Sequence, residues 1–163
     1  MPIIHILAAT LLLGPTPAPR SQDTPPAAVK QALEKQQGTW LAFSSRRDGN
    51  DADPEIVRTI ERVVKDDKAV WSRDGKRFAG SSIVLDPTTD PASIDVIPDG
   101  GPHRDQHVLG IYKLDGDQLS ICMADAGKPR PKSFSAEAGE TQTLQTFKRK
   151  PDANPNPNPN QAR

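Results

Sequence analysis

The chain has 163 residues, which is enough for one domain with its own hydrophobic core. Lysine plus arginine and aspartate plus glutamate both total 21, which argues against nucleic acid or an anionic membrane as the main partner, because either needs a basic face. A single cysteine excludes an intramolecular disulfide and a Cys-x-x-Cys metal or redox site.

Residues 1–26 are predicted to be a signal peptide-like segment with a Pro-rich spacer. The apolar run from Ile3 to Leu13 is too short to span a bilayer and is typical of an export signal. The run has no preceding Lys or Arg, and prolines at 15, 17 and 19 interrupt the usual cleavage pattern, so a misplaced start codon or an apolar tail are the alternatives. We expect a periplasmic or secreted protein with no integral membrane span.

Residues 27–150 are predicted to fold, and residues 151–163 are not. A short helix is expected over Ala27–Gln37, with Gly38 as its stop. The Asn-Pro repeats after residue 151 offer no donors for a β-ladder and nothing apolar to bury, so we expect a disordered tail.

Between the helix and the tail, short apolar stretches alternate with turn residues about every ten positions, as in a β-meander, sandwich or barrel. Within 54–64 the helical and strand signals compete, and we expect a helical turn that leads into a strand near Ile60. The predicted strands are Thr39–Arg46, Ile60–Val64, Ala69–Ser72, Arg77–Leu85, Ser93–Ile97, His107–Leu114, Gln118–Met123, Thr141–Lys148 and a shorter one near Lys132–Ser135. The fold class is therefore all-β, a small antiparallel barrel of about eight short strands with a short N-terminal helix.

Two Asp-Gly pairs predict two-residue hairpins, because Asp-Gly suits the type I′ turn. A turn centred on Asp74-Gly75 places Trp71 opposite Phe78, an aromatic pair across the strands. A turn centred on Asp115-Gly116 likewise sets apolar side chains opposite each other, and its predicted pairs are Tyr112 with Leu119, Gly110 with Ile121 and Val108 with Met123.

Trp40 is predicted to close one end of the barrel. It follows the stop at Gly38, where a large flat side chain can cap the opening. In a closed meander the last strand returns beside the first, which brings Lys148, Arg149 and Lys150 to the same end. One of these cations is expected over the indole ring, and the alternative is that Trp40 is an ordinary core residue.

Several stretches resemble a large lipocalin-like paralogous family of planctomycete proteins. The most specific is Gly-Ile-Tyr-Lys-Leu-Asp-Gly-Asp at 110–117, and the Gly-x-Trp at 38–40 also resembles the opening of true lipocalins. The other stretches are 37–40, 85–87, 93–96, 119–122, 128–131 and 142–144. The resemblance implies a small antiparallel barrel, often behind a signal peptide, and implies no reaction.

No catalytic or metal constellation emerges from the sequence. His103 and His107 lie near Asp99 and Asp105, but no third strong ligand has motif spacing, and no metal or cofactor is expected. The Ser81-Ser82 pair lacks a positioned base. Cys122 is expected to point away from the barrel interior, as a small packed residue.

Trp71, Phe78 and Tyr112 are the candidates to line a ligand cavity if the barrel is open inside, and otherwise they fill it. The function expected first is an extracytoplasmic binding module for a small apolar or amphipathic ligand. The alternative is a protein-interaction or envelope-associated structural module with a filled barrel. An enzyme is the least favoured class.

Overall fold

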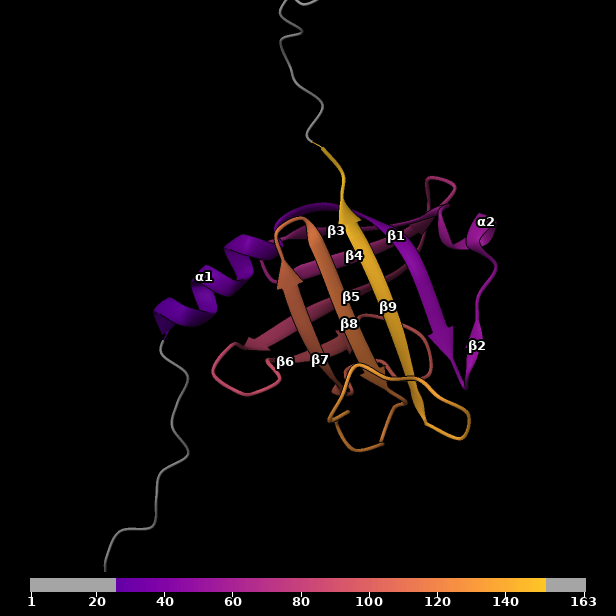
Figure 1. The fold of residues 1–163 in the computed structure, drawn as a ribbon. Coiled ribbons are helices and arrows are strands. Elements are labelled where there is room, and N and C mark those ends of the chain that lie inside the picture. The colour runs from indigo at the N-terminus through magenta and orange to yellow at the C-terminus, as the bar shows by residue number, and fades with distance from the viewer. Residues whose placement is uncertain (1–25, 152–163) are drawn as a thin grey trace, which may run out of the picture.

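A computed structural model describes residues 26–151, drawn in colour in Figure 1. The predicted export segment up to residue 25 and the Asn/Pro tail from residue 152 lie outside these residues. Within 26–151, helices are too short or too polar to cross a membrane.

Helix α1 spans Pro26–Gln36 and lies beside one end of the barrel (Figure 1). Gly38 follows it with a φ of +102°, a backbone conformation that favours glycine, so the predicted stop is confirmed. Ala32 and Leu33 turn toward the barrel and pack against its core. The apolar side of this short helix therefore fixes it to the end of the barrel where the first strand begins.

The strands form one antiparallel sheet in which β1 pairs with both β3 and β9, so the sheet closes. Of the nine strands in the sheet, the two-residue β2 pairs only with the end of β1, and the other eight make the barrel. The strands are β1 (Gly38–Arg47), β2 (Asn50–Asp51), β3 (Ile60–Lys65), β4 (Lys68–Arg73), β5 (Lys76–Asp86), β6 (Ser93–Pro98), β7 (Val108–Asp115), β8 (Gln118–Ala124) and β9 (Gln142–Arg149). The predicted fold class is confirmed.

Residues 54–64 form a short helix followed by a strand, as predicted from their competing helical and strand signals. Helix α2 spans Pro54–Val57, and the side chain of its N-cap Asp53 accepts a hydrogen bond of 2.8 Å from the Glu55 N–H. The chain then enters β3 at Ile60. The strand predicted near Lys132–Ser135 does not form, since this stretch belongs to the irregular loop 125–141.

The first hairpin has the predicted turn but a different register. Asp74 and Gly75 both have positive φ, as a type I′ turn requires. A β-bulge then shifts the pairing, so Trp71 lies opposite Ala79 and not opposite Phe78. The predicted aromatic pair is therefore wrong: Phe78 is 57% exposed, and Trp71 packs edge-on against Phe147, with ring centroids 5.6 Å apart.

The second hairpin turns one residue later than predicted. Its two loop residues are Gly116 and Asp117, and Asp115 pairs with Gln118. The positive φ falls on Gly116 at the first loop position, where a type II′ turn needs glycine. The observed pairs are consequently Tyr112 with Ile121, Leu114 with Leu119 and Gly110 with Met123, each two residues away from the prediction. A shift of two residues keeps every side chain on its predicted face.

A second, smaller apolar cluster lies outside the barrel wall. Ile111 and Cys122 pair across β7 and β8, point outward and are buried together with Ala124 and Ala136. The loop 125–141 covers them. Cys122 thus has the predicted outward direction, and the loop shields it from solvent.

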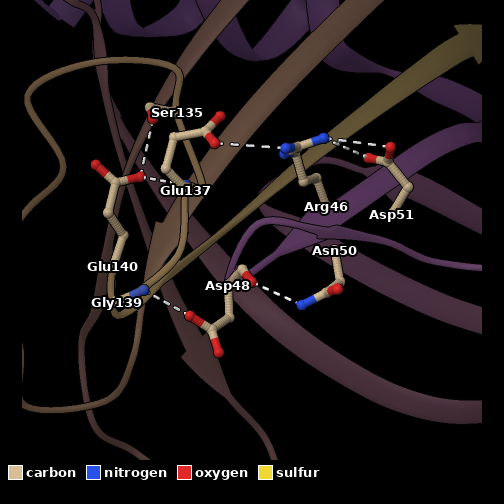
Figure 2. Close-up of polar contacts among 8 residues, drawn as sticks. All are labelled: Arg46, Asp48, Asn50, Asp51, Ser135, Glu137, Gly139 and Glu140. Atoms are coloured by element: carbon tan, nitrogen blue, oxygen red, sulfur yellow. Dashed lines mark hydrogen bonds and ion pairs between the residues drawn. The ribbon is translucent and has the colours of Figure 1, made fainter.

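A set of polar contacts joins this loop to the β1–β2 turn (Figure 2). Arg46 binds Asp51 on its own hairpin and Glu137 in the loop. Asp48 accepts a hydrogen bond of 2.6 Å from the Gly139 N–H. Within the loop, Glu140 accepts hydrogen bonds from the Ser135 hydroxyl at 2.8 Å and the Glu137 N–H at 2.6 Å.

Candidate functional site

The barrel encloses a cavity of about 250 Å³ between its middle and the end opposite α1. The wall is mostly apolar, and its polar members are an arginine, a serine and a glutamine. Lining residues that are buried are Arg62, Ala69, Ser81, Ile83, Ile94 and Ile121, and half-buried ones are Trp71, Val96, Pro98, Val108, Met123 and Gln145.

Exposure shows where the cavity opens. Pro98 ends β6 and Val108 begins β7, so both lie at the end of the barrel opposite α1, and both are half-buried. The α1 end is filled by fully buried side chains that include Trp40, Phe147 and Leu119. The cavity therefore opens at the end opposite α1.

Arg62 is the charged side chain of the cavity wall, and it is 1% exposed. Its Nη2 donates a hydrogen bond of 3.1 Å to the Gln36 side-chain oxygen, and its guanidinium lies 5.8 Å from the centre of the Trp71 ring. Its Nη1 has no hydrogen-bond partner, and no ion pair forms between Arg62 and a carboxylate of residues 26–151. Burial lowers the pKa of this guanidinium to about 10, so it stays charged at neutral pH.

Other buried polar groups nearby also lack partners. The Ser81 hydroxyl lines the same cavity and has no hydrogen-bond partner among residues 26–151. The side-chain nitrogen of Gln36, a residue outside the cavity wall that binds Arg62 through its oxygen, has none there either. Buried polar groups in folded proteins are nearly always hydrogen-bonded. An arginine N–H and an amide N–H are donors, and a hydroxyl can also donate, so these three groups share the capacity to donate a hydrogen bond.

The three side chains predicted to line a cavity are not brought together. Trp71 lines the barrel cavity described above. Tyr112 is buried and faces a separate, more open hollow of about 540 Å³ between α1 and the loop at Pro87–Pro91. Phe78 is on the outside, under the guanidinium of Arg73, because the bulge in β5 displaces it from the ladder.

Of the three cations considered for Trp40, Arg149 lies over the indole ring, with its Cζ 4.1 Å from the ring centroid. Its two terminal nitrogens donate to the carbonyl oxygens of Lys35 at 2.7 Å and Gln37 at 2.6 Å. The Trp40 indole N–H donates to the Gln36 carbonyl at 2.9 Å. These contacts fasten the end of α1 across the first and last strands.

The other candidate residues have local partners. His107 Nδ1 lies 3.1 Å from an oxygen of Asp95, Asp99 pairs with Arg77, and no group of three or more potential metal ligands gathers within 26–151. The Cys122 thiol donates a hydrogen bond of 3.2 Å to the Ser135 carbonyl, and burial raises its pKa.

Sequence reasoning missed Arg62 altogether. The predicted strand Ile60–Val64 contains Arg62, but only helix against strand was weighed for that segment, and Arg62 was given no role. The alternation of side chains along a strand could have revealed its position. Arg62 is two residues from both Ile60 and Val64, so it lies on the same face of the strand as they do. Val64 is 3% exposed, which places that face in the core.

Fold and cavity together define a class: a closed eight-stranded antiparallel β-barrel with one end plugged and a partly polar cavity behind the other. Comparison adds no name to that class, because the chain matches no protein-family model, no curated protein and no solved structure.

Proposed function

We propose that this domain is a non-enzymatic binding module that takes a small amphipathic molecule into its barrel. The observation that carries the proposal is the cavity of about 250 Å³, whose apolar wall is interrupted by buried polar groups without partners. Ligand sites share this character: mostly apolar surface with a few polar groups that fix orientation.

The size of the cavity limits the ligand. A cavity of about 150 Å³ with an apolar lining holds one benzene ring, so about 250 Å³ holds a ring with a short side chain or a medium-length alkyl chain. Pockets that bind drug-sized ligands measure about 300–1,000 Å³, so a large lipid does not fit entirely inside this smaller cavity.

Binding is favoured over catalysis because the cavity wall holds no activated nucleophile. Among the residues that line the cavity, Ser81 has a side chain that could act as a nucleophile. Its hydroxyl has no hydrogen-bond partner among residues 26–151, so no base activates it.

Export to the periplasm or the exterior, and membership of the lipocalin-like planctomycete family, are parts of the same proposal. They are supported by the apolar N-terminal run and by the 110–117 stretch.

The test is a titration with neutral probes, 1-octanol and indole, followed by methyl NMR. We expect shifts at Ile83, Ile94 and Ile121 inside the cavity. The variant Val96→Trp places a ring in the cavity wall and should abolish the shifts. Its matched control is Val84→Trp, at a position that is 50% exposed, which should leave them unchanged.

Two results would overturn the proposal. One is the absence of any methyl shift with either probe at millimolar concentration. The other is a set of shifts that persists in Val96→Trp, since binding would then lie elsewhere. Either result favours a protein-interaction or envelope-associated structural module.

A further inference from the structure

We infer that the cavity selects small carboxylic acids, with the carboxylate held by the Arg62 guanidinium and the hydrocarbon or aromatic part against the apolar wall. The inference rests on the proposed function and names the chemical class of its ligand. Four observations carry it: the burial of a charge, the kind of partner that is missing, the position of the charge in the cavity and the size of the space.

The first observation is a buried charge without a counter-charge. Arg62 is 1% exposed, and its neighbours are a neutral amide at Gln36 and the face of Trp71. Moving an ion out of water costs several kcal/mol unless it is paired, and proteins rarely bury an arginine without an acid. A sequence that keeps such a charge against its cost is expected to use it.

The second observation is that the unpartnered groups are donors. Nη1 of Arg62 has only hydrogens to offer, and the free side-chain nitrogen of Gln36 likewise donates. Ser81 on the same wall also offers a hydroxyl hydrogen. A carboxylate is an acceptor with two oxygens and a negative charge, so it satisfies several donors and the ion at once.

A neutral acceptor fits less well. A water molecule or an alcohol can accept the hydrogen bond from Arg62 Nη1, but it leaves the charge unpaired. A carboxylate adds the attraction of its negative charge for the guanidinium to the hydrogen bond, and a neutral acceptor supplies no such attraction. Because the cavity wall is mostly apolar, that attraction is less screened than it is at the surface.

The third and fourth observations set the pose and the size. Arg62 pairs with Trp40 on one side and Trp71 on the other, so it sits toward the plugged end of the space, and the opening lies opposite. The carboxylate therefore enters first, and the apolar part extends along Ile83, Ile94 and Val96. About 250 Å³ suits a medium-chain acid such as octanoate or an arylpropionate.

The experiment compares octanoate with 1-octanol on the full chain at pH 7.5, by calorimetry. We expect octanoate to bind about 10- to 100-fold more tightly, the range that a charge-assisted hydrogen bond supplies. Arg62→Met should remove that preference while octanol still binds. Arg73→Met is the matched control, because that arginine is exposed and lies over Phe78 outside the barrel, and it should change neither affinity.

A second measurement needs no variant. With octanoate labelled at the carboxyl carbon, the bound carboxyl should titrate at a lower pH than the free acid, because a neighbouring guanidinium favours its ionised form. Equal affinities for octanoate and octanol, or an unshifted titration of the bound acid, would overturn the carboxylate inference and leave the amphipathic cavity intact. Failure of both probes to bind would instead overturn the proposed function.

Discussion

Arg62 is a charged residue that β3 buries inside the barrel. In the sequence it stands between Glu61 and Val63 in a strand that also contains Lys65, and in the fold it is one of the largest fully buried side chains. Glu61 is half-buried and Lys65 is exposed, although all three residues lie within one short strand. The difference arises only because alternate residues of a strand face opposite sides of the sheet.

We predict that Arg62→Met raises the stability of the protein without ligand. Burial lowers the pKa of Arg62 in the folded state to about 10, so the unfolded chain binds this proton more tightly than the folded one. The buried charge therefore costs stability at all pH values below about 10, and stability should rise as pH increases beyond that value. Even buried ion pairs replaced by apolar side chains of similar size often gain about 1–4 kcal/mol of stability, and Arg62 has no ion-pair partner within residues 26–151 to lose.

Urea denaturation at pH 7.5 measures this effect, with Arg73→Met as the control that should stay within about 0.5 kcal/mol of the wild type. A loss of more than about 1 kcal/mol in Arg62→Met would mean that the bond to Gln36 and the contact with Trp71 outweigh the cost of burial.

At the scale of elements, the turns were predicted better than the pairings. The Asp74-Gly75 turn formed with positive φ at both residues, yet the bulge after it moved Phe78 out of register. A bulge depends on how one strand bends around the barrel, which the local sequence does not record. In the other hairpin, Gly116 took the first loop position, and Asp115 stayed in the strand.

The loop 125–141 is the element whose attachment can be tested. We predict that Glu140→Gln loosens it, because the mutation removes the negative charge that accepts from the Glu137 N–H and the Ser135 hydroxyl. Since the loop covers Cys122, the native thiol should react several-fold faster with a disulfide reagent at pH 8. Glu34→Gln on the exposed side of α1 should leave the rate unchanged. An unchanged rate in Glu140→Gln would show that apolar packing alone holds the loop.

The same carboxylate gives the loop a dependence on pH. The Glu137 N–H and then the Ser135 hydroxyl lower the pKa of Glu140. A group whose pKa is depressed by folding stabilises above its unfolded pKa, which is about 4.3 for glutamate, and loses that contribution as the pH falls through the folded value. Amide exchange at Glu137 should therefore accelerate in acid, relative to barrel amides, in the wild type and not in Glu140→Gln.

At the scale of the whole molecule, closure depends on contacts between residues more than a hundred positions apart. Trp40 and Arg149 pair directly across β1 and β9, and Arg149 also binds the Lys35 carbonyl at the end of α1. One side chain therefore joins the helix, the first strand and the last strand. The plug at this end leaves the opposite end as the route to the cavity.

We predict that Arg149→Met destabilises the fold by about 1–2 kcal/mol, through the lost stack on Trp40 and the lost hydrogen bonds to the helix end. The matched control is Lys148→Met on the same strand, where the cation lies over the exposed ring of Phe43, and its effect should stay within about 0.5 kcal/mol. Thermal or urea melts that show equal losses in the two variants would contradict a special role for Arg149.

The sequence by itself determined the class of fold, the helix stop at Gly38, the approximate strands and the neighbourhood of the two chain ends of the domain. These features follow from local rules: alternation of apolar residues, turn chemistry and the geometry of a closed meander. Of the three aromatic residues predicted for the site, sequence reasoning placed only Trp71 on the wall of the cavity that the structure shows.

Only the tertiary structure decided the register at the bulge, the loop that covers Cys122, and the cavity with its unpaired Arg62. Each of these depends on side chains that meet across several strands, so no short stretch of sequence contains it. A cavity in particular is the space that packed side chains leave unfilled, and this depends on the sizes and directions of a dozen residues from seven strands at once.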